Sequence, residues 1–326
     1  MSPSWAIVAT VDEPAPLVTA FVAHHLNEGA QAVHLYLDKN DRDTVKALRD
    51  MPGCILTRCN NHHWRAHNGG RHPYLHTRRQ LINANVAYAD CKADWLIHCD
   101  ADEFIRSGAA LTADLAEVPA DCDHARLAVA ERVMPPTRAQ QTLFDGVFRR
   151  PLKGADEVIA DIYRSHALFL ENGLTGHPSG KAAVRVGRGL KIGIHQPRPM
   201  VPSVPLPRTR LLHFDGLTEF HYLVKLLRRA HEKPLPGAPR HSDGRMAQIA
   251  RVKEIAHDPA AFAALAKALK SLTPAQELRL NGLDLIDPEP FRPNLGPLNP
   301  DLSVAHFDAA LRVKLAEYFA LIGFVG

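Results

Sequence analysis

Residues 5–37 decide the type of fold, and they read WAIVATVDEPAPLVTAFVAHHLNEGAQAVHLYL. Residues 5–11 are short and apolar and run into polar residues, which is typical of a buried strand. In residues 14–28 the apolar side chains recur at helical spacing, and Gly29 follows as a stop signal. Residues 32–37 form another apolar run. The stretch therefore predicts a strand, a helix and a second strand.

The same alternation continues to residue 100. Further strands are predicted at residues 54–57 and 94–99, and further helices at residues 41–49 and 74–91. An alternation of strands and helices indicates a parallel sheet with helices on both faces. The predicted class is thus α/β, with a mixed, mainly parallel, Rossmann-like sheet flanked by helices. Ligands of such sheets bind outside the carboxyl ends of the strands.

The later part of the chain has a different pattern. Short strands separated by loops rich in Gly and Pro are predicted at residues 126–133, 167–170, 182–186, 190–194 and 210–214. Helices are predicted at residues 217–232, 245–272 and 307–319, and a Pro-rich linker lies between the first two of them. The predicted domains are therefore an α/β catalytic domain, a linker and a C-terminal helical extension, at residues 1–232, 233–244 and 245–326.

Composition excludes several classes of protein. The chain has 326 residues, of which 46% are hydrophobic and 23% charged, so it can bury a sizeable core and is not intrinsically disordered. A net charge of +4 is too small to indicate a nucleic-acid partner. Five cysteines without a CxxC pair favour a reduced, cytoplasmic protein. We expect no signal peptide and no transmembrane segment, and peripheral contact with the inner face of a membrane stays open.

Residues 94–104 carry the sharpest chemical signal, and they read DWLIHCDADEF. An apolar strand ends here in Asp100 and Asp102, which are two residues apart and can therefore face the same side. Two carboxylates at the end of a strand suit Mg²⁺ or Mn²⁺. A surface turn with acidic residues is the alternative, and the position at the end of the fourth strand favours the metal site.

Several motifs in order resemble those of the GT-A-fold glycosyltransferases of the family-2-like type, in the bacterial branch with a D-x-D-E-F motif. The matching segments are residues 12–14, 21–29, 36–44, Gln80 and Asn85, 94–104, Gly180-Lys181 with Arg185, and 212–225. Asp12 stands where the family has Asn, and Phe21 where it has Trp. The resemblance implies a GT-A fold, a nucleotide-sugar donor, a divalent cation on the two aspartates and an inverting transfer.

The predicted site residues follow from strand ends and from this resemblance. A late metal ligand, His213, is implied to join Asp100 and Asp102, with His195 as a rival. The residues predicted to bind the donor are Glu13, Asp38, Arg79, Gln80, Asp100 and Lys225. Glu13 and Asp38 end the first two strands and can accept hydrogen bonds from base or ribose, while Arg79 can pair with phosphate. For Asp38, capping of a turn is the alternative.

The general base is not identified by the sequence. Asp161 and Glu171 are candidates because they lie between the two aspartates and His213, while Asp156, Glu157 and Glu131 are not excluded.

Five histidines gather in a segment with several arginines, at residues 62, 63, 67, 72 and 76. Their spacing fits no standard zinc pattern. The segment at residues 60–73 is predicted to be a polar loop, either at the rim of the active site or merely solvated.

The predicted function is metal-dependent, inverting transfer of a sugar from a nucleotide diphosphate donor, with a UDP-sugar favoured. The acceptor would be a hydroxyl of a glycan or a lipid-linked molecule, as in polysaccharide biosynthesis. A metal-dependent nucleotidyltransferase remains an alternative, although residues 10–14 lack the Gly-rich loop that such enzymes usually carry. A non-catalytic sugar-binding protein on a degenerate GT-A fold is the other alternative. A dinucleotide-binding oxidoreductase is disfavoured because no GxGxxG follows the first strand.

Overall fold

The computed structural model describes residues 2–232, 241–255 and 257–322. The chain forms two compact units. The first comprises Met1–Val129, Ser179–Leu211 and Pro293–Asp301, and the second comprises Ala130–Pro178, Leu212–Arg292 and Leu302–Gly326. These units interleave along the chain, whereas the predicted division at residues 232 and 244 follows chain order. Most of the predicted linker, residues 233–240, lies outside the described residues.

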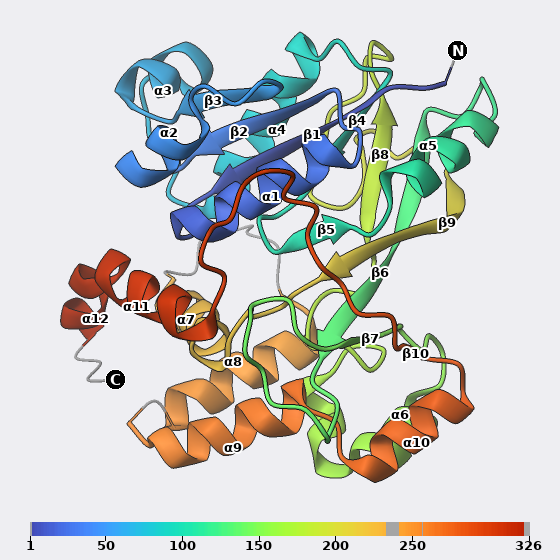
Figure 1. Ribbon diagram of the computed structural model, residues 1–326, viewed down its shortest axis with the longest axis vertical. Helices are drawn as coiled ribbons and strands as arrows, with labels where there is room; N and C mark the ends of the chain where they lie inside the picture. Colours follow the sequence, from blue (N-terminus) through green and yellow to red (C-terminus); the bar gives the residue numbers. More distant parts are fainter. Residues whose placement is uncertain (1, 233–240, 256, 323–326) are drawn as a thin grey trace. The chain divides into compact units, whose positions relative to one another are not determined.

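Four parallel strands form the centre of the first unit (Figure 1). In their order across the sheet they are β3 (Cys54–Arg58), β2 (Ala32–Leu37), β1 (Trp5–Val11) and β4 (Trp95–His98). Antiparallel strands follow beside β4: first β8 (Lys181–Arg185), then the first half of β6 (His124–Val133). A short strand, β5 (Glu103–Ile105), pairs with β9 (Val204–His213). The predicted α/β class, with a mixed sheet whose N-terminal strands are parallel, is confirmed.

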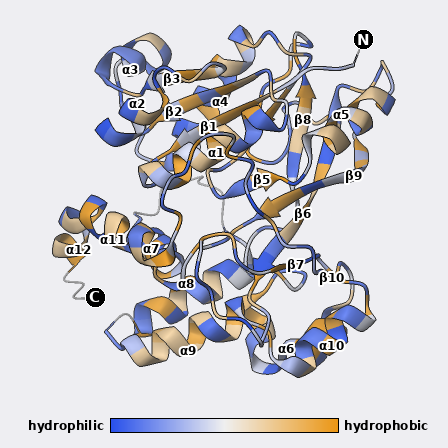
Figure 2. Ribbon diagram, in the orientation of Figure 1, coloured by the Kyte–Doolittle hydropathy of each residue, from blue (hydrophilic) through white to orange (hydrophobic). Residues whose placement is uncertain are grey.

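Helices cover the sheet of the first unit. They are α1 (Ala15–Asn27), α2 (Arg42–Leu48), α3 (Asn61–Asn68), α4 (His76–Asp90) and α5 (Gly108–Glu117). All residues of β1 are buried, as expected of a central parallel strand covered on both faces. On one face, Ala6 and Val8 pack with Ala84 of α4 and Trp64 of α3. Because side chains alternate along a strand, Ile7 faces the opposite side. Strands β1 and β2 have mainly hydrophobic colours in Figure 2.

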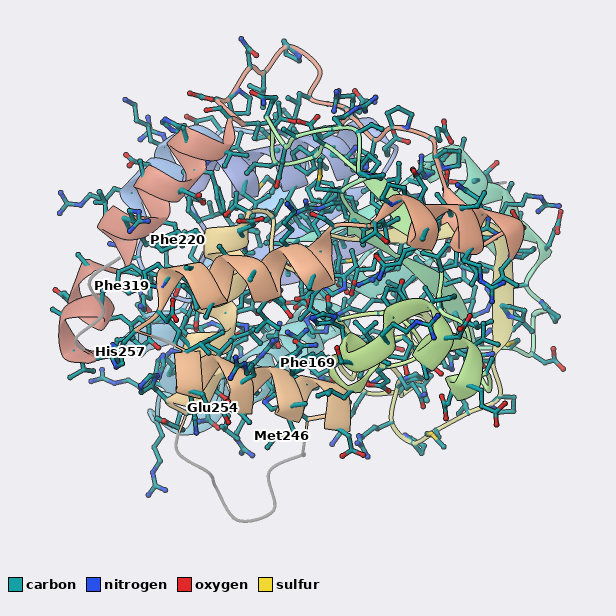
Figure 3. The ribbon with its side chains drawn as sticks, turned by 90° about the horizontal axis from the view of Figure 1, so that it is seen from below. Phe169, Phe220, Met246, Glu254, His257 and Phe319 are labelled. Carbon is teal, nitrogen blue, oxygen red and sulfur yellow. The ribbon has the colours of Figure 1, made fainter. Side chains whose placement is uncertain are left out.

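The second unit is largely helical. Its strands β7 (Val147–Arg149) and β10 (Ile286–Asp287) pair antiparallel, and β7 also pairs with the end of β6. Its helices are α6 (Asp156–Tyr163), the 3₁₀ helix η1 (Arg164–Phe169), α7 (Glu219–Ala230), α8 (Asp243–Ile255), α9 (Pro259–Lys270), α10 (Pro274–Gly282), α11 (Val304–Lys314) and α12 (Ala316–Ile322). Tyr222 of α7, Val252 of α8 and Leu269 of α9 share one buried cluster. The rings of Phe220 and Phe319 lie 5.8 Å apart (Figure 3).

Three sequence-based expectations about local structure are wrong. Residues 60–73 are not a plain loop, because the Asn60 side chain accepts hydrogen bonds from two backbone amides and caps helix α3. Residues 167–170 lie mostly in η1 rather than in a strand. Residues 190–194 contain no strand, and Lys191 makes only an isolated bridge with Arg198. The helical region at residues 245–272 is confirmed but consists of α8 and α9, with Asp258 capping the second. None of the helices in the described part of the chain is long and apolar enough to span a membrane.

Candidate functional site

Carboxylates gather where three neighbouring parallel strands end. Asp12 and Glu13 follow β1, Asp38 follows β2, and Asp100 and Asp102 follow β4. Val11 of β1 lies opposite Leu37 of β2, and the backbone N–H of Asp38 donates to the carbonyl of Val11. Strand β1 lies between β2 and β4 and runs parallel to both, so their carboxyl ends meet at one edge of the sheet. The structure thus brings together the predicted residues of the first unit.

Asp38 is held by a buried ion pair with Arg79 of α4. Arg79 Nε donates to Asp38 Oδ1 at 2.6 Å, and its Nη2 donates to Asp38 Oδ2 at 2.7 Å. Its Nη1 donates to the carbonyls of Pro73 and Tyr74. Burial alone would raise the pKa of Asp38, but His76 and Arg79 hold that pKa well below its usual range. All three nitrogens of Arg79 therefore already donate hydrogen bonds within the protein, which disfavours the predicted pairing with phosphate.

Asp100 is fixed by a second ion pair. Gln80 donates to Asp100 Oδ1, and the Nζ of the fully buried Lys181 lies 2.9 Å from Oδ2. Lys181 also lies 3.1 Å from Glu103 Oε2, which accepts the backbone N–H of Asp100 at 2.8 Å. Burial opposes these charges, yet Lys181 keeps the pKa of Asp100 well below its usual range. Lys181 and Gln80 thus orient one of the two aspartates.

Glu13 and Asp102 form the acidic side of the edge. Both are shielded from solvent to a large extent. Burial, followed by the negative charge of Asp102, raises the pKa of Glu13 to about 7. Two carboxyl groups that repel each other in this way fit a divalent cation, which would relieve the repulsion.

A cation at this edge would take only part of its ligands from the protein. Within residues 2–232, 241–255 and 257–322, no three His, Cys, Asp or Glu side chains are grouped closely enough to hold a metal ion. Mg²⁺ and Mn²⁺ usually bind one or two carboxylates together with substrate phosphates, and the edge fits that pattern. His213 lies in the second unit, so its predicted contact with the same cation stays a prediction.

The surroundings of His213 are tightly packed. A Cβ atom added to Gly176 would lie 2.6 Å from Cε1 of His213, so only a glycine leaves the imidazole in place. The N–H of Gly176 donates to Oε2 of Glu131 at 2.6 Å. Glu131 also accepts from Thr175 and from Arg149, with the latter bond 2.7 Å long. The rival ligand His195 lies in the first unit, where its Nδ1 is 2.9 Å from the carbonyl of Gly180.

Asp215 is the centre of a second charged group in the same unit. Its Oδ1 lies 3.0 Å from Lys225 Nζ, and its Oδ2 accepts from Arg245 Nη2 at 2.7 Å. Thr175 Oγ1 links Asp215 to Lys270, whose Nζ lies 3.1 Å away. Burial lowers the pKa of Lys270 to about 8, although the negative charges of Glu131 and Asp215 act to raise that pKa. Lys225, predicted to bind the donor, is thus engaged with Asp215.

The structure separates the candidates for the general base. Glu131 has no exposed surface, and Lys270 and Arg149 hold its pKa below the usual range against the effect of burial, so it is a structural residue. Asp161 is exposed and forms ion pairs with Arg164 and Arg279. Among the residues that the structure describes, Oε2 of Glu171 has no hydrogen-bond partner although it is buried. Asp156 and Glu157 are exposed in the first turn of α6. Glu171 is therefore the candidate whose carboxylate oxygen is buried and yet has no partner among the described residues.

The cluster of histidines is mostly helical. His62, His63 and His67 lie on α3 and line a cavity of about 490 Å³ beside β3. His63 Nε2 lies 2.8 Å from Oδ1 of the buried Asn83, which ties α3 to α4. His76 of α4 lies 3.5 Å from Asp38 and so reaches the acidic edge. Only this last histidine joins the candidate site.

Several residues of the site were not singled out from the sequence. Lys181 stands in the Gly180-Lys181 stretch of the resemblance, which was a usable signal. Glu103 stands in the D-x-D-E-F motif, but its pairing with Lys181 depends on the antiparallel addition of β8 to β4. Asp215 and Arg245 are far apart in sequence, and no motif links them.

Comparison with known proteins assigns no family. No family model and no curated sequence match the chain. One similar solved structure, the mannosyltransferase PcManGT from Pyrobaculum calidifontis in complex with GDP-Man and Mn²⁺, is 11% identical at a TM-score of 0.34; the match covers 97% of this chain and 87% of that one. Another, S. aureus TarS, is 9% identical at a TM-score of 0.31, and the match covers 82% of this chain and 81% of that one.

A third solved structure, CMP:2-keto-3-deoxy-manno-octonic acid synthetase with CTP, is 17% identical at a TM-score of 0.27. That match covers 43% of this chain, which spans only 62% of the length of the synthetase. Similarities at this level assign neither a family nor an activity to the chain.

Proposed function

We propose that this protein is a glycosyltransferase that takes a sugar from a nucleotide diphosphate donor and transfers it to a hydroxyl of a glycan or lipid-linked acceptor. The observation that supports this best is the acidic edge of the first unit. There the carboxyl ends of β2, β1 and β4 carry Asp38, Glu13 and Asp102, and buried basic residues fix two of the neighbouring carboxylates. Ligands of α/β sheets bind at such an edge.

Each side chain of the edge has a proposed role. Asp38 accepts hydrogen bonds from the ribose or base, and the ion pair with Arg79 fixes the orientation of its carboxylate. Glu13, with its raised pKa, can donate or accept a hydrogen bond at neutral pH. Gln80 and Lys181 hold Asp100 in one orientation. Arg79 thus acts through Asp38 rather than on a phosphate.

Asp102 and Asp100 would hold Mn²⁺ or Mg²⁺, and His213 is proposed as a third ligand. When bound, the cation neutralises the charge that develops on the departing nucleoside diphosphate. The chain's own residues have the tasks of positioning the two carboxylates and of keeping Asp100 ionised. Lys181 does this for Asp100, since it holds the pKa of that carboxyl well below its usual range.

An inverting transfer needs a base that takes the proton of the acceptor hydroxyl, and we propose Glu171 for this role. It has a buried oxygen that no described residue engages, whereas Asp161 is occupied by two arginines. A general base needs a lone pair within hydrogen-bond reach of the hydroxyl.

The test is a donor panel with purified protein and Mn²⁺, in which release of nucleoside diphosphate is measured. We expect release from one UDP- or GDP-sugar, strong inhibition by EDTA, and a loss of about 10²-fold or more in Asp102→Ala because an electrostatic stabiliser is removed. Asp50→Ala is the matched control, since Asp50 is an exposed carboxylate paired only with Arg49 in the described contacts. Full activity of Asp102→Ala would refute the metal site. Release of pyrophosphate from a nucleoside triphosphate would instead identify a nucleotidyltransferase.

A further inference from the structure

A buried guanidinium in the second unit has donors without an acceptor. Arg245, in the first turn of α8, is 8% exposed, and its Nη2 donates to Asp215. Its Nη1 is buried and has no hydrogen-bond partner among the described residues. Leaving donors of a charged group unsatisfied is costly, so such a group in a native protein calls for an explanation. Met246, the next residue of α8, is labelled in Figure 3.

Several charged side chains surround Arg245. In the contacts of the described residues, two carboxylates are shared by four basic side chains: Glu131 and Asp215 by Arg149, Lys225, Arg245 and Lys270. Buried charges are usually paired, so the unpartnered Nη1 of Arg245 is the part of this cluster that a negatively charged group would satisfy.

The two basic groups that such a group would contact lie next to each other. Lys225 and Arg245 each donate a hydrogen bond to a different oxygen of the Asp215 carboxylate, so their charged groups are close neighbours. The Lys225 side chain is 20% exposed and connects the cluster to solvent. The amino end of α8 adds a partial positive charge in the turn that carries Arg245.

From this arrangement we propose that the second unit binds the phosphate or diphosphate group of a phosphorylated acceptor, with Arg245 Nη1 and Lys225 as its donors. The proposal deepens the proposed function, because it selects a phosphorylated, lipid-linked acceptor over a neutral glycan. A guanidinium suits an oxygen-rich anion, since it presents two parallel N–H donors.

The binding test uses the full chain in EDTA, so that the metal-dependent donor site of the first unit does not contribute. Pyrophosphate and geranyl diphosphate should both bind and raise the Tm, while geraniol should not. Arg245→Gln should weaken both affinities about 10- to 100-fold, as expected for the loss of charge-assisted hydrogen bonds. Arg251→Gln is the matched control on α8, where Arg251 is exposed and pairs with Glu254; it should bind like the wild type.

Two comparisons separate this proposal from the proposed function. Asp102→Ala should lose donor turnover but keep pyrophosphate binding in EDTA. Binding of UDP with Mn²⁺ should be unchanged in Arg245→Gln; an equal loss would place the anion site in donor binding and overturn the acceptor assignment. A wild-type protein that millimolar pyrophosphate neither binds nor stabilises would refute the site even if Arg245→Gln fails to fold.

Discussion

Replacement of Arg79 by Met tests how the acidic edge is built. In the wild type, the Arg79 side chain is 10% exposed and donates four hydrogen bonds of 2.6–2.9 Å, two of them to Asp38. Removing one partner of a buried pair leaves the other charge uncompensated and costs about 3–5 kcal/mol. His76 lies 3.5 Å from Asp38 and can still donate a hydrogen bond to it, so we expect the lower limit, about 3 kcal/mol at pH 8.

The loss should depend on pH in a defined direction. In the wild type the pKa of Asp38 lies well below its usual range. The ionised carboxylate therefore contributes to stability at every pH above the pKa that Asp38 has in the unfolded chain, and this contribution is constant between pH 5 and 8. In Arg79→Met the buried carboxyl lacks its main cation, so its folded pKa should rise above the unfolded value. The variant then regains stability as the pH falls through that raised pKa. The difference between the two proteins should therefore be larger at pH 8 than at pH 5.

Tryptophan fluorescence during urea unfolding measures this in the correct part of the chain. All three tryptophans, Trp5, Trp64 and Trp95, are buried in the first unit, so the signal reports the unfolding of that unit. Arg78→Met is the matched control, because Arg78 is the exposed neighbour on α4 and its loss should change stability by less than about 0.5 kcal/mol. A loss below about 1 kcal/mol in Arg79→Met, or an equal loss at both pH values, would show that the ion pair does not hold the edge together.

Two further predictions concern the second unit. Gly176→Ala should leave the fold intact but displace the His213 imidazole, because the new Cβ would lie 2.6 Å from its ring; Mn²⁺ affinity, followed by electron paramagnetic resonance with UDP present, should fall about 10- to 100-fold. Wild-type affinity in this variant would exclude His213 as a ligand. Glu171→Gln should lower kcat about 10²-fold or more with little change in KM, whereas Asp161→Asn should keep most of the activity. The reverse ranking in steady-state kinetics would make Asp161 the base.

The sequence was sufficient for the parallel half of the fold because local signals and tertiary structure agree there. Strand β1 is apolar throughout and buried throughout, and a stop signal at Gly29 separates α1 from β2. Helix α3 was missed because its polar composition is typical of a loop. The Asn60 cap, the packing of Trp64 and the hydrogen bond between His63 and Asn83 stabilise it. Weak local preferences of this kind are decided by tertiary contacts.

The same distinction applies to the site. Residues at strand ends could be predicted, since the carboxyl ends of neighbouring parallel strands must share an edge. The partners of those residues could not. Lys181 reaches Asp100 only because β8 adds to β4 in the antiparallel direction, and Arg79 meets Asp38 from the first turns of α4. Long-range pairs are set by topology, which hydrophobic periodicity does not encode.

The acidic edge of the first unit and the charged group around Asp215 in the second unit differ in composition, and this difference bears on the reaction. The edge of the first unit carries the carboxylates of Asp12, Glu13, Asp38, Asp100, Asp102 and Glu103. The ion pairs described there involve Lys39, Arg79 and Lys181. Such an edge would repel a diphosphate unless a divalent cation binds with it. In the second unit Lys225 and Arg245 contact Asp215, and Arg245 Nη1 has no partner among the described residues, so the proposed phosphate group would bind there directly. Donor binding should consequently require a cation, and acceptor binding should not.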